Sequence, residues 1–189
     1  ESTPVWIMRQ AGRYLPQYRE LRKKADFLTF CKTPELVAEA TAGAAEILGV
    51  DAAILFSDIL IPLEAMGMEL IFDEPGGPRL PKPIAAAADL AHYHVPDPAE
   101  TMCFVLDAIQ KTRDRLAGEI PLIGFAGAPF TLAAYAVDGG GSKSYHRTLG
   151  WMHGDPAGFE ALLDFMTRVI TVSLRAQVAA GVHAVQIFD

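Results

Sequence analysis

The sequence predicts an α/β fold with a parallel β-sheet, and two patterns in the chain support this prediction. Short, continuously apolar segments that are rich in branched or aromatic residues recur at 4–8, 52–56, 121–125 and 184–188. Such uninterrupted runs are typical of strands that are covered on both faces, as in parallel sheets. Stretches of helical character separate the runs, and this alternation of strand and helix is typical of an α/β architecture.

The first clear helix follows the apolar run at 4–8 and begins at Thr33. This residue offers a hydroxyl at the N-cap, Pro34 suits the first turn, and Glu35 places an acid near the positive end of the helix dipole. An alanine-rich run then extends to Leu48, and Gly49 is a typical C-cap. We therefore expect a helix that leads directly into the second apolar run.

Two more helices separate the later runs. One is expected from Pro98 to Leu116, ending at Gly118. The other opens at Asp155, carries apolar residues at helical spacing and stops at Gly181. Before them, residues 66–83 are rich in proline and glycine, which indicates a long excursion with turns rather than a domain linker.

The bulk properties indicate a protein with a sizeable core and exclude several classes. A length of 189 residues fits one domain, and a net charge of -7 argues against a nucleic-acid binder. No apolar run reaches the roughly 20 residues of a membrane-spanning helix. Cys31 and Cys103 form no disulfide framework or paired-cysteine metal signature, so we expect a reduced, cytoplasmic setting.

The two ends of the chain lie close to apolar runs. The chain stops at 187–189 without a polar tail, and it opens almost at once into 5–8. We therefore expect residues 1–189 to form a single, partial domain that is truncated at both ends.

The strongest local motif is the segment at 8–16 (MRQAGRYLP). Arg9 and Arg13 flank a small pair, Ala11 and Gly12, just after a predicted strand. Small residues let a backbone approach a ligand closely, and the arginine fork matches carboxylates. The motif therefore predicts a site for an anionic ligand.

More positive charges follow at Arg19, Arg22, Lys23 and Lys24. Charge runs of this kind usually solvate a helix face, and we interpret these four residues in that way. Arg9 differs from them because it directly follows a predicted buried strand.

A second motif is 56–60 (FSDIL), in which Asp58 follows the apolar run at 52–56. The carboxyl ends of strands in α/β folds are where residues contact ligands. An aspartate in this position also caps a following helix in many proteins, and Ser57 or Asp58 would serve. Position alone leaves both alternatives open.

A third motif, 124–132 (GFAGAPFTL), places small residues at a strand end, where they indicate close packing near a cavity. Tyr135 lies one helical turn after Thr131, so both would face the same cleft; taken alone, such a tyrosine is more often a packed aromatic residue. The run at 139–144 (GGGSKS) lacks the spacing of a phosphate-binding loop and is interpreted as a flexible loop.

Two histidines, His92 and His94, are spaced as metal ligands on a strand would be, but no nearby acid or cysteine completes a site. A surface segment is the better interpretation, and no metal is expected.

Together these motifs resemble the signatures of the uroporphyrinogen decarboxylases. The matching segments, in order and spacing, are 4–16, 56–60 and 124–132 with Tyr135 and 139–142. The resemblance implies a (β/α)8 TIM-type barrel with its active site at the carboxyl ends of the strands, of which this chain supplies roughly the first half. It also implies decarboxylation, without a cofactor, of the four acetate side chains of uroporphyrinogen III to give coproporphyrinogen III in haem biosynthesis.

The resemblance also implies roles for individual residues. Asp58 binds the pyrrole N–H groups of the porphyrinogen substrate and stabilises the cation formed on protonation, with Tyr135 as its partner. Arg9 holds substrate carboxylates and is implied as a proton donor, although guanidinium is a poor acid. Substrate-binding residues would be Arg9, Gln10, Ala11, Gly12, Arg13, Asp58 and Tyr135. The pyrrole is itself the electron sink, so no metal or organic cofactor is expected.

The family further implies a homodimer, with a serine or threonine and a histidine contributed by a later half, so that these 189 residues alone would be inactive. Two alternatives stay open. One is a corrinoid-linked methyltransferase of a related barrel family, and the other is a non-catalytic tetrapyrrole-binding fragment.

Overall fold

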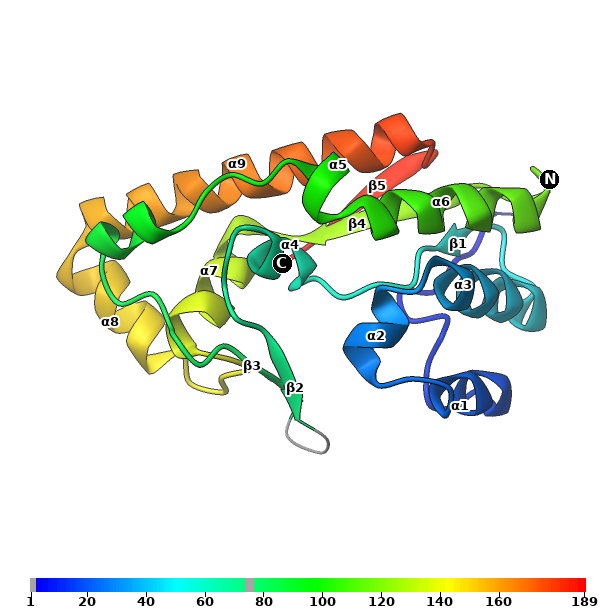
Figure 1. Cartoon of the computed structure of the whole chain (residues 1–189), viewed down its shortest axis with the longest axis horizontal. Coiled ribbons are helices and arrows are strands. Elements are labelled where there is room, and N and C mark those ends of the chain that lie inside the picture. The colour runs from blue at the N-terminus through cyan, green and yellow to red at the C-terminus, as the bar shows by residue number, and fades with distance from the viewer. Residues whose placement is uncertain (1–2, 74–76) are drawn as a thin grey trace. The chain divides into compact units, whose positions relative to one another are not determined.

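The computed structural model describes residues 3–73 and 77–189 (Figure 1). The chain divides into two compact units. The first unit consists of Glu1–Asp58, Met102–Phe125 and Leu174–Gln186, and the second of Ile59–Thr101, Ala126–Ser173 and Ile187–Asp189. The prediction that 1–189 is a single domain stays a prediction.

The first unit contains most of a small sheet and the helices that flank it. Its complete elements are α1 (Pro16–Arg22), α2 (Phe27–Cys31), α3 (Pro34–Leu48), β1 (Ala53–Ile54) and α6 (Cys103–Leu116). It also contains most of β4 (Leu122–Gly127) and of β5 (Ala184–Phe188), and the carboxyl end of α9 (Pro156–Ala180).

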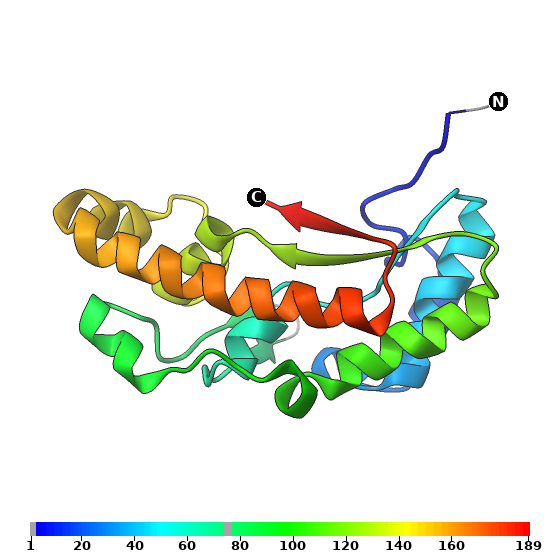
Figure 2. The same ribbon diagram turned by 90° about the horizontal axis from the view of Figure 1, so that it is seen from above.

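The sheet has the strand order β1-β4-β5. Strands β1 and β4 pair in parallel, with Ala53 opposite Leu122 and Ile54 opposite Ile123. Figure 2 shows the arrows of β4 and β5 pointing the same way. Because helices connect these parallel strands, the predicted α/β fold with a parallel sheet is confirmed.

Small residues let α3 pack closely against α6. Ala38 and Ala45 of α3 and Ala108 and Ile109 of α6 are buried. Short side chains at such a contact bring two helix axes close together. The alanine-rich composition of α3 is therefore a packing feature as well as a helix-forming one.

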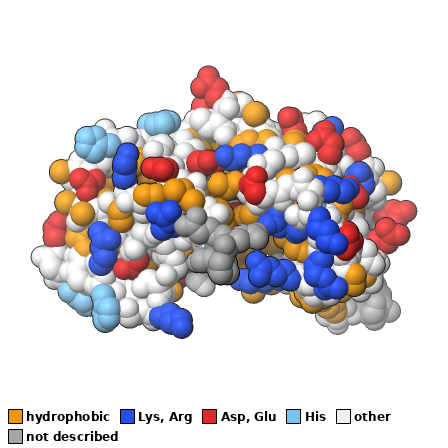
Figure 3. Space-filling model, turned by 60° about the horizontal axis from the view of Figure 1, so that its bottom comes forward, with side chains coloured by type: hydrophobic (Ala, Val, Ile, Leu, Met, Phe, Trp, Pro, Cys, Tyr) orange, Lys and Arg blue, Asp and Glu red, His pale blue; other side chains and the backbone are white. Residues whose placement is uncertain are grey.

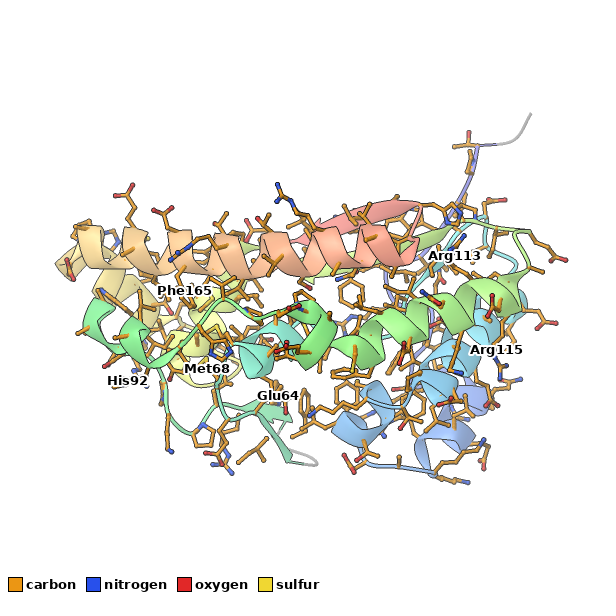
Figure 4. All side chains as sticks on the ribbon, turned by 45° about the horizontal axis from the view of Figure 1, so that its top comes forward. Glu64, Met68, His92, Arg113, Arg115 and Phe165 are labelled. Carbon is orange, nitrogen blue, oxygen red and sulfur yellow. The ribbon has the colours of Figure 1, made fainter. Side chains whose placement is uncertain are left out.

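The predicted ends of two helices are confirmed. Gly49 ends α3 with a φ of 61°, and Gly181 follows α9 with a φ of 107°. A side chain at Gly181 would also collide with the guanidinium of Arg113, which Figure 4 labels on α6. Thr33 does occupy the N-cap position of α3, but its hydroxyl donates to the carbonyl of Thr29 and does not cap the helix.

The predicted strand at 4–8 is wrong. These residues form no strand and are exposed. Val5 alone is held, since its N–H donates to the Asp51 carboxylate at 2.7 Å and its carbonyl accepts from the Asp51 N–H at 2.9 Å. An apolar run forms a strand only where successive residues make backbone hydrogen bonds to a neighbouring strand. In this run such bonding is limited to Val5.

The second unit is built mainly from helices. Its complete elements are α4 (Ile61–Ala65), β2 (Ile71–Asp73), β3 (Gly77–Arg79), the 3-10 helix η1 (Ala87–His92), α5 (Pro98–Thr101), α7 (Pro129–Asp138) and α8 (His146–Gly154). The amino-terminal part of α9 completes it. Over residues 3–73 and 77–189, no helix is long and apolar enough to cross a membrane.

The excursion at 66–83 contains two antiparallel strands that were not predicted. Strands β2 and β3 pair Ile71 with Arg79 and Phe72 with Pro78. Pro75 and Gly76, which belong to the predicted excursion, lie outside the described residues.

The helix predicted from Pro98 to Leu116 is interrupted. It consists of α5 and α6, and Met102 between them has φ −129° and ψ 23°. The Met102 side chain at this break is buried.

Candidate active site

The arginine motif forms a tight turn that leads into α1. The N–H of Leu15 donates to the carbonyl of Gly12 at 2.9 Å. The Tyr14 hydroxyl donates to the carbonyl of Gln10 and lies 3.0 Å from that of Arg9. These bonds tie the backbone to itself and leave the side chains of Arg9 and Arg13 exposed. The turn can therefore present two guanidinium groups from a fixed backbone.

Gln10 anchors this turn to the sheet. Its side chain is only 2% exposed, with its amide nitrogen 2.7 Å from the carbonyl of Ala52. Its amide oxygen accepts from the N–H of Ile54 at 3.2 Å. The side chain thus takes the backbone bonds that a neighbouring strand would make with β1. Its buried amide therefore makes Gln10 an anchor of the turn.

Two of the four basic residues predicted to solvate a helix face do more than that. Arg19 donates to the carbonyl of Arg13 at 2.7 Å and so holds the arginine turn. Arg22 is half-buried, donates to the carbonyl of Ala25 at 2.7 Å and stacks on the ring of Phe27, with 5.3 Å to its centroid. The prediction is wrong for Arg22, because a carbonyl group and aromatic rings face its guanidinium group. Arg19 is exposed as predicted, and it also holds the turn.

For the two lysines the interpretation is confirmed. Lys23 is exposed and pairs with Glu20 at 2.7 Å, and Lys24 lies 3.9 Å from Glu39. Figure 3 shows Lys and Arg side chains gathered on one part of the surface. Lys23 and Lys24 add positive charge just after α1 without fixing the backbone.

Asp58 lies between β1 and α4 and is half-buried. The N-cap position of α4 belongs to Leu60, so neither Ser57 nor Asp58 occupies it, and the capping alternative is wrong. The backbone before Asp58 is held from α3, because the hydroxyl of Thr41 accepts from the N–H of Phe56 at 2.9 Å.

An aromatic cluster in this unit links α1 to Phe56, two residues before Asp58. The ring of Phe56 lies 5.5 Å from that of Tyr18 and 5.2 Å from that of Phe30. Burial raises the pKa of Tyr18, and the nearby Arg22 opposes this rise. Tyr18 belongs to α1, which follows the turn, so the cluster joins the arginine motif to the strand end that carries Asp58.

Cys31 adds a buried thiol to this region. Its side chain is 2% exposed, and burial raises the pKa of the thiol, with the negative charge of Asp58 raising it further. The thiol therefore stays neutral beside the Asp58 carboxylate. Cys31 was not predicted as a site residue, because a single cysteine carries no spacing signal.

Tyr135 belongs to the second unit, where it projects from α7 and lines a cavity of about 330 Å³. Arg79 and Asp138 line the same cavity. The Asp138 carboxylate accepts from the hydroxyl of Thr148 at 2.9 Å. Thr131 donates to the carboxylate of Asp189 at 3.3 Å, and its predicted sharing of a cleft with Tyr135 stays a prediction.

The glycine run after α7 has a packing role. Gly140 has a φ of 152° and forms a β-bridge with Arg79 of the hairpin. A Cβ atom at Gly140 would lie 2.8 Å from the carbonyl oxygen of Pro78, which is closer than a side chain tolerates. The interpretation as a flexible loop missed this contact, which explains why glycine is required there.

Metal ligands are not grouped in the part of the chain that the structure describes, where no three His, Cys, Asp or Glu side chains lie close enough to hold an ion. His92 and His94 are exposed, as the surface interpretation predicts.

The family model described as uroporphyrinogen decarboxylase matches residues 1–189. The chain is 54% identical to the uroporphyrinogen decarboxylase of Chloroherpeton thalassium over 189 residues, which is 100% of this chain and 54% of the relative. It is 52% identical to that of Pelodictyon phaeoclathratiforme (99% of this chain, 53% of the relative). It is 51% identical to that of Geobacter metallireducens (100% and 55%). The chain therefore spans about half the length of the curated relatives it matches.

Among solved structures, a methyltransferase from Methanosarcina mazei is similar to this chain, with a TM-score of 0.71 and 25% sequence identity. The match covers 89% of this chain and 50% of the methyltransferase.

Proposed function

The chain belongs to the uroporphyrinogen decarboxylase family, and from this premise we propose that it forms part of an enzyme that decarboxylates uroporphyrinogen III to coproporphyrinogen III. The observation that carries the proposal is the arginine turn, which the buried amide of Gln10 binds to β1. Asp58 follows the end of β1 by four residues. A fixed cationic turn beside a strand that is followed by a carboxylate suits a substrate with acidic side chains around a ring of N–H donors.

Arg9 and Arg13 bind substrate carboxylates in this proposal. Both side chains are exposed, and the turn beneath them is held by Tyr14 and Arg19. Guanidinium–carboxylate bonds are strong and geometrically specific when the arginine is held in place. The backbone of Gln10, Ala11 and Gly12 lies against the macrocycle.

Asp58 is the proposed electrostatic centre. Loss of carbon dioxide from a pyrrole acetate leaves an electron pair, which the ring accepts once an adjacent pyrrole carbon has been protonated. A proton from water then converts the resulting exocyclic methylene into the methyl group, and the ring carbon releases its proton. An ionised Asp58 accepts hydrogen bonds from the pyrrole N–H groups and stabilises this cation as it forms. Arg9 is proposed to supply the proton.

Tyr135 remains a proposed catalytic residue. It is supported by the family resemblance and by the cavity that it lines together with Arg79. No cofactor is part of this proposal, because the substrate's own pyrrole serves as the electron sink.

We further propose that the chain supplies about the first half of a (β/α)8 barrel in a cytoplasmic homodimer. The parallel pairing of β1 with β4 and the similarity to the methyltransferase structure support the barrel. Sedimentation of the complete gene product that contains these 189 residues tests the dimer, and a monomer would contradict it.

The test of the function is anaerobic incubation of the complete gene product with uroporphyrinogen, with products separated by carboxyl number. We expect stepwise removal of the four acetate carboxyl groups. A folded protein that forms no product would contradict the proposal. Corrinoid-dependent methyl transfer and tetrapyrrole binding would then be measured, since the 25% identity to a methyltransferase is the observation that favours the first of these.

A further inference from the structure

We infer that Thr41 is a positioning residue, whose hydroxyl fixes the backbone from which Asp58 projects. The inference rests on the proposed function, in which Asp58 stabilises the cationic intermediate. Thr41 lies on α3, outside all three sequence motifs.

The hydroxyl of Thr41 makes two hydrogen bonds in a buried environment. The residue is 1% exposed, and its hydroxyl donates to the carbonyl of Val37 at 2.8 Å. The same oxygen accepts from the N–H of Phe56 at 2.9 Å. A hydroxyl has one hydrogen and two lone pairs, so the bond to Val37 fixes the hydrogen and leaves a lone pair for Phe56.

The bond between Phe56 and Thr41 lies where the backbone pairing of β1 with β4 ends. The N–H of Leu55 still donates to the carbonyl of Ile123 on β4, at 2.9 Å. The next N–H, that of Phe56, donates to Thr41 instead. The Thr41 hydroxyl therefore replaces the neighbouring strand as the hydrogen-bond acceptor, two residues before Asp58.

The ring of Phe56 is held independently of its backbone. It packs against Tyr18 and Phe30, with ring centroids 5.5 Å and 5.2 Å away. Without the Thr41 acceptor, the Phe56 N–H would have to turn to another partner while the ring stayed in the cluster. The peptide units that follow, including that of Asp58, would then change direction. Small displacements of a catalytic group are costly, because reactive geometry tolerates little error.

The chain offers a matched control at Thr112 on α6. This residue is 0% exposed, and its hydroxyl donates to the carbonyl of Ala108 at 2.7 Å. Within the described residues no strand N–H donates to it. Thr112→Val therefore removes a hydroxyl from the same kind of buried helical site, without affecting the segment between β1 and Asp58.

The experiment compares wild type with Thr41→Val, Thr41→Ser and Thr112→Val in the complete gene product, by anaerobic steady-state kinetics and thermal unfolding. We expect Thr41→Val to lower kcat about tenfold or more with little change in KM, as misplacement of a reacting group predicts. Thr41→Ser keeps the acceptor and should restore most of kcat. Thr112→Val should keep the wild-type kcat even where its thermal stability falls as far as that of Thr41→Val.

Wild-type kcat in folded Thr41→Val would overturn the inference while leaving the proposed function intact. Equal losses of kcat from Thr41→Val and Thr112→Val would also overturn it, because the effect would then be general destabilisation. If Thr41→Val does not fold, Thr41→Ala replaces it under the same criteria. An inactive wild type would instead contradict the proposed function, and the role of Thr41 in the reaction with it.

Discussion

Gln177 occupies both backbone hydrogen-bonding positions of Phe125. Its amide oxygen accepts from the Phe125 N–H at 2.9 Å, and its amide nitrogen donates to the Phe125 carbonyl at 2.9 Å. A buried side chain of α9 thus stands in for a neighbouring strand beside β4, as Gln10 does beside β1. The bond also explains Gly124, because a Cβ atom there would lie 2.5 Å from the Gln177 amide oxygen.

Replacing Gln177 with leucine should destabilise the protein. The variant removes both amide bonds from Phe125 while keeping an apolar side chain of similar size. Buried backbone groups that lose their partners cost about 1–3 kcal/mol of unfolding free energy, and urea unfolding measures this loss. Gln110→Leu, at an exposed position on α6, is the control and should change the free energy by less than about 0.5 kcal/mol. Similar values for the two variants would contradict this account of Gln177.

Arg19→Ala should weaken substrate binding, although Arg19 is not proposed to touch the substrate. Its guanidinium holds the carbonyl of Arg13 at 2.7 Å, so its removal loosens the turn that presents Arg9 and Arg13. We expect KM for uroporphyrinogen to rise several-fold in anaerobic steady-state assays.

The control for Arg19 is Lys23→Ala, which removes an equal charge from the same region. Lys23 is exposed and pairs with Glu20, not with the turn. Equal rises in KM from the two variants would mean that the basic residues act as a diffuse field, and would refute the specific role of Arg19.

Asp26 should contribute stability that depends on pH. Its carboxylate caps α2 by accepting from the N–H of Thr29 at 3.0 Å and from the Thr29 hydroxyl at 2.5 Å. The hydroxyl bond, and then the backbone bond, lower the pKa of Asp26. Because the folded pKa lies below the unfolded value, the contribution is complete above the unfolded pKa, about 3.9, and is lost as pH falls through the folded pKa.

Asp26→Ala should therefore lower the unfolding free energy at pH 7 by about 0.5–2 kcal/mol, the usual cost of losing an N-cap. Urea unfolding at a series of pH values should show this difference shrinking in acid. Asp26→Asn keeps an acceptor at the cap without a titrating group, so its difference from Asp26→Ala should not vary with pH. A wild-type advantage over Asp26→Ala that is constant down to strongly acidic pH would exclude the proposed role of the carboxylate.

Local signals in the sequence were sufficient for the ends of two helices and for part of the sheet. Glycines with positive φ end α3 and follow α9, and both ends were predicted because few other residues adopt that conformation. The strands β4 and β5 were predicted from continuous apolar runs, and the position of Asp58 after β1 followed from the same pattern.

Features that depend on distant partners were not predicted. Residues 4–8 have the composition of a strand but lack a continued ladder, and composition carries no record of a partner. The bond from Arg19 to the carbonyl of Arg13 was not predicted, because the conformation of the turn decides where that carbonyl lies. Thr41 and Gln177 belong to ordinary helical patterns, and their importance appears only when the strand N–H groups that they accept from are known.

Activity of Asp58→Asn tests the central claim most directly. The substitution preserves the shape of the side chain and removes its charge, and Asp114→Asn at an exposed position on α6 is the control. In anaerobic incubations of the complete gene product with uroporphyrinogen, we predict no decarboxylated products from Asp58→Asn, retained porphyrinogen binding, and wild-type products from Asp114→Asn. Wild-type product formation by Asp58→Asn would contradict the account, because the charge assigned to stabilising the cation would then be dispensable.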